Sequence, residues 1–67
     1  MKNRLKEIRA QKNLTQEQLA QKAGISRPAL TQIENGKTVP DGNTIAALVK
    51  ALDTPANSIF FDLDVVF

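Results

Sequence analysis

Residues 15–27 read Thr-Gln-Glu-Gln-Leu-Ala-Gln-Lys-Ala-Gly-Ile-Ser-Arg, and this stretch decides the fold. Its first four residues form a capping box, in which the Thr15 hydroxyl accepts from the backbone N–H of Gln18 and the Gln18 side chain reaches back. Leu14 before the cap and Leu19 after it are placed to pack across the helix start as a hydrophobic staple. The pattern therefore predicts a helix that begins at Thr15.

A second helix start follows eleven residues later at Ser26, with Ile25 and Leu30 as the matching apolar pair. Gly24 can adopt the positive φ that ends a helix abruptly. The two predicted helices, over residues 15–23 and 26–34, are separated only by Gly24 and Ile25. This arrangement is a helix-turn-helix.

Three more short helices are predicted, over residues 3–12, 43–52 and 54–60. The apolar residues of the second have the i, i+3, i+4, i+7 spacing of a core-facing helix, and Asp41 or Gly42 would cap it. Thr54 and Pro55 are predicted as the N-cap and first helical residue of the third. Nothing before residue 59 has the pattern of a strand. The prediction is a single all-α domain of five helices over residues 1–67.

Composition excludes several classes of protein. The chain has 67 residues and contains no cysteine, histidine or tryptophan. The usual zinc ligands and the nucleophile–base pairs of hydrolases are missing, so we expect no metal, no cofactor and no enzyme. No apolar run approaches the roughly 20 residues of a membrane span. We therefore expect a cytoplasmic protein without a membrane partner.

The charge is unevenly distributed along the chain. The net charge is +2, but residues 1–50 carry +5 and residues 51–67 carry −3. A basic body with an acidic, apolar tail suggests two faces with different roles.

Residues 15–27, together with Ile33-Glu34-Asn35-Gly36-Lys37 and Pro40, closely resemble the phage-repressor and Cro type of helix-turn-helix, the Xre family. The resemblance covers residues 3–60. It implies a lambda-repressor-like domain, prokaryotic or phage in origin, that binds double-stranded DNA as a homodimer on a palindromic operator and regulates transcription, most often as a repressor. An open alternative is an antitoxin that binds a partner protein and autoregulates its operon.

In this family, the side of the second motif helix that faces away from its apolar residues enters the major groove. Arg27 can bond guanine bidentately and Gln32 can pair with adenine, although Arg27 could instead bind a phosphate. Pro28 can offer only apolar contact, for example to a thymine methyl group. The full set of candidate base-reading residues is Ser26, Arg27, Pro28, Thr31 and Gln32.

The candidate phosphate contacts are Gln16, Asn35, Lys37 and Thr38. Gln16 stands at a helix N-terminus, where unpaired N–H groups favour an anion. The resemblance implies that this Gln binds a phosphate and supports the neighbouring base reader; the alternative is an exposed side chain without a ligand. For Asn35 we expect helix capping as the main role. The resemblance also implies a partly buried structural ion pair between Arg9 and Glu34.

The last nine residues, 59–67, contain all three aromatic residues. From Phe61 onward, large apolar residues alternate with other residues at a period of two, which favours a strand. We predict that this strand pairs with a second chain; alternatives are that it covers the monomer core, binds a partner protein or continues as a helix. The candidate dimerisation residues are Phe61, Leu63, Val65 and Phe67.

Overall fold

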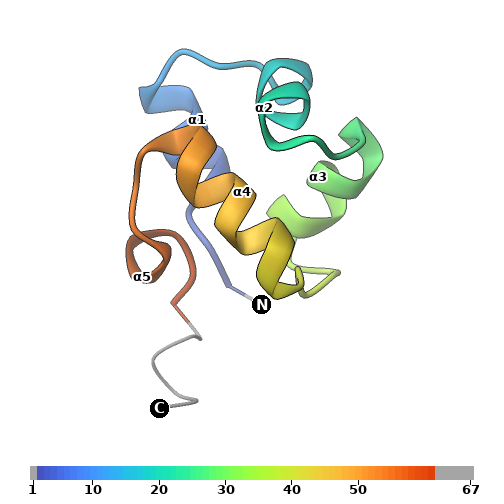
Figure 1. Cartoon of the computed structure of the whole chain (residues 1–67), viewed down its shortest axis with the longest axis vertical. Helices are drawn as coiled ribbons and strands as arrows, with labels where there is room; N and C mark the ends of the chain where they lie inside the picture. The colour runs from blue at the N-terminus through green and yellow to red at the C-terminus, as the bar shows by residue number, and fades with distance from the viewer. Residues whose placement is uncertain (1, 62–67) are drawn as a thin grey trace.

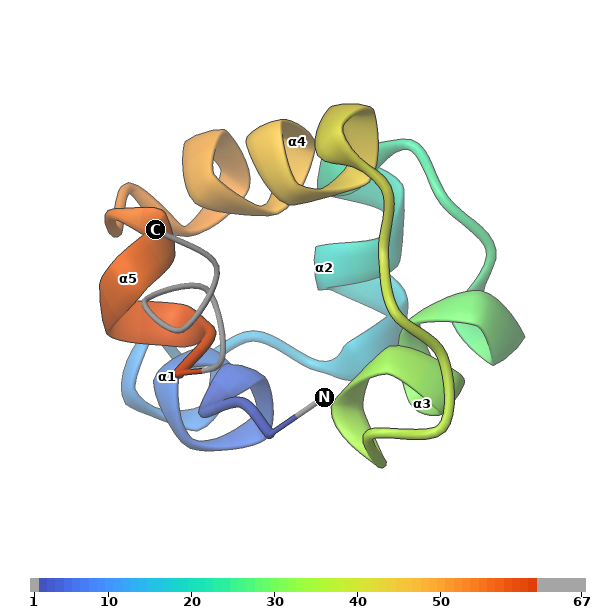
Figure 2. The same cartoon turned by 90° about the horizontal axis from the view of Figure 1, so that it is seen from below.

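The computed structural model describes residues 2–61. It contains five helices: α1 (Leu5–Gln11), α2 (Gln16–Ala23), α3 (Arg27–Glu34), α4 (Gly42–Leu52) and α5 (Ala56–Ile59). The predicted all-α, five-helix architecture is confirmed. Helices α3 and α5 lie at opposite sides of the molecule (Figures 1 and 2). None of the helices in the described part of the chain is long and apolar enough to span a membrane.

Three predicted helix caps are present. Thr15, Ser26 and Asp41 each accept, through a side-chain oxygen, the backbone N–H three residues further on, and Thr15 forms the complete capping box with Gln18. At Asp41 the bond from the Thr44 N–H, 2.8 Å long, holds the pKa of the carboxyl below its ordinary value because it favours the charged form. Each cap therefore fixes where its helix begins.

The motif turn has the predicted geometry. Gly24 ends α2 with φ +70°, and Ser26 already caps α3. Pro28 lies in the first turn of α3, where its missing N–H costs no helical hydrogen bond. The two motif helices are thus joined by a turn too short to let them move independently.

The core forms where α2 packs against α3 and α4. Leu19, Leu30 and Leu48, one from each of these helices, are fully buried, as are Leu5 of α1 and Phe60. Full burial of one such side chain contributes about 1.5–3 kcal/mol. Because α2 and α3 share this core, the orientation of α3 is set by packing along its whole inner side.

The first helix begins at Leu5, two residues later than predicted. Asn3 forms an antiparallel bridge with Phe60, and the Arg4 N–H donates to the Ile59 carbonyl over 2.8 Å. The Asn3 side-chain oxygen accepts from the Leu5 N–H at 3.0 Å. Residues 3 and 4 therefore stay outside the helix, because they pair with the other end of the fold.

The predicted cap of the last helix is wrong. Pro55 is the N-cap residue of α5 and makes no side-chain cap bond, whereas the Thr54 hydroxyl donates back to the Leu52 carbonyl at 2.9 Å. Asp53 ends α4 in a left-handed conformation (φ +50°), and Thr54 follows it directly. Thr54 thus completes the end of α4 and not the start of α5.

Of the predicted dimerisation residues, only Phe61 is described. The residue is 45% exposed, and its N–H donates to the Lys2 carbonyl at 3.3 Å. Leu63, Val65 and Phe67 lie outside the described residues. Pairing of the tail with a second chain therefore stays a prediction.

Candidate nucleic-acid interface

The outer side of α3 presents the residues that the sequence selected. Leu30 and Ile33 are buried, whereas Arg27, Pro28 and Gln32 are exposed and Thr31 is half-buried. Ser26, at the entrance to the helix, is exposed as well. The predicted base-reading residues therefore lie together along one face of one short helix.

Two hydroxyl groups on this face already have intramolecular partners. The Ser26 Oγ accepts from the Ala29 N–H at 3.2 Å, and the Thr31 hydroxyl donates to the Arg27 carbonyl at 3.0 Å. Both groups therefore help to hold the first turn of α3. The longer polar side chains of Arg27 and Gln32 are better placed to reach beyond the helix.

Gln16 is neither simply exposed nor unpaired. Its amide nitrogen donates to a Glu34 carboxylate oxygen at 2.9 Å. Its amide oxygen accepts from Arg27 Nε at 3.4 Å and lies 3.3 Å from the Thr31 hydroxyl, whose single proton it shares with the Arg27 carbonyl. The contact with Arg27 is of the kind that the resemblance implied, whereas the contact with Glu34 was not predicted, because no local spacing signals that the start of α2 meets the C-terminal end of α3.

The structure contains the ion pair expected between Arg9 and Glu34. Arg9 Nε lies 2.8 Å from a Glu34 oxygen, and the two side chains are only 14% and 2% exposed. A second guanidinium nitrogen of Arg9 donates to the Leu14 carbonyl at 3.0 Å. The pair ties α1 and the chain before α2 to the end of α3.

The loop after α3 carries the other candidate phosphate contacts. Asn35 is the C-cap residue, and its N–H donates to the Thr31 carbonyl at 3.0 Å, while the Gly36 N–H donates to the Ile33 carbonyl at 3.0 Å. Gly36 turns the chain with φ +74°. Lys37 and Thr38 follow and are both exposed. The loop therefore presents one cation and one hydroxyl beside the C-terminal end of α3.

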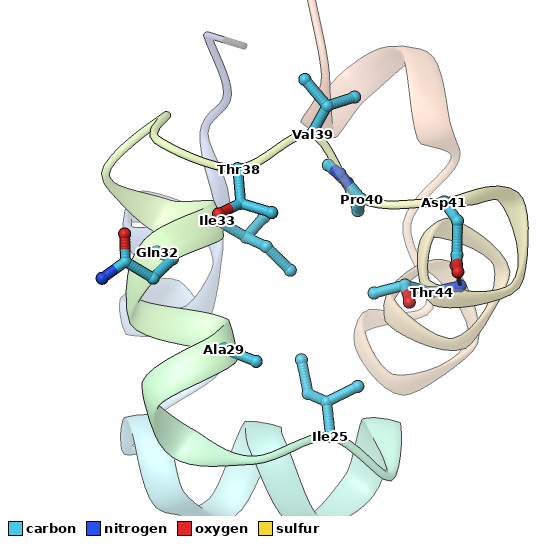
Figure 3. A pocket seen from close by; sticks show the side chains of 9 residues that line it. All are labelled: Ile25, Ala29, Gln32, Ile33, Thr38, Val39, Pro40, Asp41 and Thr44. Carbon is cyan, nitrogen blue, oxygen red and sulfur yellow. Dashed lines mark hydrogen bonds between the residues drawn. The ribbon is translucent and has the colours of Figure 1, made fainter.

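A groove of about 350 Å³ lies between α3 and the loop that leads into α4 (Figure 3). Ile25, Ala29 and Ile33 line it on the α3 side, facing Val39 and Pro40 across the groove. The Gln32 amide points away from the groove, toward the outside of α3. The described residues that line the groove include no lysine or arginine, so it does not have the chemistry of a phosphate site.

Among residues 2–61, no group of three or more metal-ligating side chains comes together. In the described part of the chain, the candidate functional side chains therefore lie on the outer face of α3, at the start of α2 and in the loop after α3.

Comparison with known proteins agrees with this geometry. A helix-turn-helix family model matches residues 5–59, which is most of the chain. An uncharacterised HTH-type transcriptional regulator of Methanocaldococcus jannaschii is 43% identical over 60 residues, covering 90% of this chain and 91% of that protein. The immunity repressor protein of Bacillus phage phi105 is 41% identical over 56 residues; the match covers 84% of this chain but 39% of the repressor.

Among solved structures, the restriction-modification controller protein C.AhdI from Aeromonas hydrophila superposes with a TM-score of 0.80. Sequence identity is 35%, and the match covers 85% of this chain and 86% of the controller protein. The similarity therefore extends over the five-helix domain and is not confined to the motif pair.

Proposed function

The chain belongs to the helix-turn-helix family of DNA-binding transcriptional regulators, and from that membership we propose that it is a homodimeric repressor that binds a palindromic operator sequence-specifically. The observation that carries the proposal is the exposed face of α3, where Arg27 and Gln32 project from a helix whose other side is buried. The phage immunity repressor among the relatives supports repression as the mode of action.

In the proposed complex α3 lies in the major groove, with Arg27 and Gln32 on base edges. Arginine bonds the O6 and N7 atoms of guanine, and glutamine bonds the N6 and N7 atoms of adenine. Ser26, Pro28 and Thr31 supply shorter contacts from the same face. Gln16, Asn35, Lys37 and Thr38 bind phosphates on either side and fix the register without reading sequence.

The dimer in this proposal is formed through residues 59–67. Two copies related by a two-fold axis place their α3 helices in successive major grooves, about 34 Å apart. The α5 end of the molecule lies opposite α3 (Figures 1 and 2), which supports the proposal that the acidic tail after it lies away from DNA. Repression then follows when the bound dimer occludes a promoter.

Selection of bound duplexes from a random pool tests the proposal most directly. We expect an enriched site with two inverted half-sites whose centres are about 10 base pairs apart. Enrichment of single, unpaired half-sites would contradict the dimer, and recovery of no consensus would contradict sequence-specific binding.

The role of Arg27 is tested on the selected site. We expect Arg27→Ala to weaken binding to that site far more than binding to random DNA, and Arg27→Lys to recover little, because an ammonium group cannot form the bidentate contact. Equal losses on both DNAs would make Arg27 a phosphate contact.

Sedimentation of a chain that lacks residues 61–67 tests the dimer, since a truncated chain that still sediments as a dimer would exclude the tail from the interface.

A further inference from the structure

The turn at the end of α3 is closed by two backbone hydrogen bonds. The Gly36 N–H donates to the Ile33 carbonyl at 3.0 Å. The Lys37 N–H donates to the Gln32 carbonyl, also at 3.0 Å. With Gly36 at φ +74°, this pair of bonds is the arrangement that commonly ends a helix and redirects the chain. The position of the loop with Lys37 and Thr38 therefore depends on this turn.

The Ile33 carbonyl in this turn has a second donor, the side chain of Asn3. The Asn3 NH₂ group donates to it at 2.8 Å, and a carbonyl oxygen has two lone pairs, so it can accept from Gly36 and Asn3 together. The Asn3 side-chain oxygen accepts from the Leu5 N–H at 3.0 Å. Only one orientation of the amide satisfies both neighbours, with its oxygen toward α1 and its nitrogen toward α3.

The backbone of Asn3 is held by the C-terminal end of the fold. Asn3 forms the antiparallel bridge with Phe60, and the next residue, Arg4, donates its N–H to the Ile59 carbonyl at 2.8 Å. Ile59 and Phe60 are fully buried, so the core anchors this pairing. The Asn3 side chain thus connects the paired chain ends to the end of α3, thirty positions away in the sequence.

We propose that Asn3 is a positioning residue for DNA binding: from the paired chain ends it holds the turn after α3, and so it presents Lys37 and Thr38 to the phosphates. A loop that is held in its binding conformation loses less entropy when DNA binds. This inference rests on the proposed phosphate-binding role of the loop. It gives the pairing of the chain ends a role at the DNA surface in addition to its role in the fold.

Asn3→Ser separates the two hydrogen bonds of the side chain. A serine hydroxyl can still accept from the N–H two residues further on, but it is too short to reach the Ile33 carbonyl. The substitution leaves the charge of the chain unchanged. The matched control is Thr54→Val, which removes the hydroxyl that donates to the Leu52 carbonyl at 2.9 Å, at the end of α4. Both variants lose one side-chain bond to a carbonyl at a helix end, so we expect similar losses of stability.

The first test measures the dissociation constants of the full chain for the selected operator and for a random duplex, at a temperature at which circular dichroism shows every variant folded. We expect Asn3→Ser to weaken binding to both DNAs by the same factor, about two- to tenfold, the worth of one ordinary hydrogen bond, because phosphate contacts do not read sequence. Thr54→Val should leave both constants unchanged. An unchanged affinity in Asn3→Ser, or a loss confined to the operator, would overturn the inference.

A double variant tests whether Asn3 acts through the loop. If it does, Asn3→Ser combined with Lys37→Ala should weaken binding by less than the product of the two single losses, because the mobile loop no longer carries the lysine. A double loss equal to that product would overturn the inference. If Lys37→Ala and Thr38→Ala each bind DNA as well as the unaltered chain, the proposed phosphate role itself fails, so the two failures are distinguishable.

The second test uses the chain without DNA. Amide hydrogen exchange, followed by NMR, compares the Gly36 N–H with the Ile25 N–H, which closes the turn after α2 on the Ala20 carbonyl at 3.0 Å. We expect exchange at Gly36 to be faster in Asn3→Ser than in Thr54→Val, and exchange at Ile25 to be the same in both. Equal acceleration at the two turns would show only a general loss of stability and would overturn the inference.

Discussion

Removal of the Glu34 carboxylate is predicted to destabilise the domain severely. Glu34 accepts three hydrogen bonds, two from Arg9 and one from Gln16, and its side chain is 2% exposed. In Glu34→Ala the Arg9 guanidinium, 14% exposed, would keep only the Leu14 carbonyl as a partner. Breaking one half of a buried pair costs about 3–5 kcal/mol, because the other charge stays buried.

That loss is large for a domain of this size. At about 0.05–0.15 kcal/mol per residue, the free energy of unfolding of the whole chain is roughly 3–10 kcal/mol. A loss of 3 kcal/mol lowers the melting temperature by roughly 12–24 °C in a domain of 60–100 residues. The assay is urea and thermal unfolding followed by circular dichroism.

The chain contains its own control for this prediction. Arg4 and Glu7 form an ion pair at 3.0 Å, close to the 2.8 Å of the buried pair, but their side chains are 40% and 58% exposed. Glu7→Ala is expected to cost about 0–1 kcal/mol. The double variant Arg9→Met/Glu34→Leu should be more stable than Glu34→Ala, since it leaves no buried charge without a partner. A Glu34→Ala variant as stable as Glu7→Ala would refute the reasoning.

Three further predictions concern single positions. Gly24→Ala should lower the free energy of thermal unfolding by about 1–2 kcal/mol because of the positive φ alone, since an added Cβ meets nothing within 4 Å. Gly42→Ala, where the φ is ordinary and the space equally open, should be neutral or slightly stabilising. Equal losses at both positions would contradict this explanation. Because folding lowers the pKa of Asp41, the stabilisation of α4 by its carboxylate should be present above about pH 4 and lost as the pH falls further. In urea titrations, the stability difference between Asp41→Asn and the unaltered chain should therefore shrink at low pH. A difference that does not change with pH would contradict the cap as its source. Lys37→Ala should lower the slope of log affinity against log salt by about 0.9 for each phosphate that Lys37 neutralises, and an unchanged slope would show that Lys37 binds no phosphate.

Local signals explain how much of the fold could be predicted. The caps at Thr15, Ser26 and Asp41 depend on residues three positions apart, so sequence alone was sufficient to place them. The same reasoning failed at Thr54, whose hydroxyl turns back to the end of α4 and completes the helix before it. A Thr-Pro pair does not reveal which of two adjacent helix ends the threonine serves.

The candidate site was predictable only in part. Residues on the outer face of α3 follow from helical periodicity once Leu30 and Ile33 are assigned to the core. The contact of Gln16 with Glu34 does not follow, because it depends on how α2 crosses α3, and the contact with Arg27 was implied only by the resemblance. The pairing of Asn3 with Phe60 was missed for a similar reason, since it joins residues from opposite ends of the chain.

The bridge between Asn3 and Phe60 has a consequence for the order of folding. It closes a loop that contains all five helices, and the entropic cost of closing a loop rises with its length. The motif pair α2 and α3, in contrast, is joined by the three residues 24–26 and packs together locally. We expect the half of the molecule that contains α2 and α3 to form early and the pairing of the two chain ends to form last, so that the bridge stabilises a helix-turn-helix that has already formed.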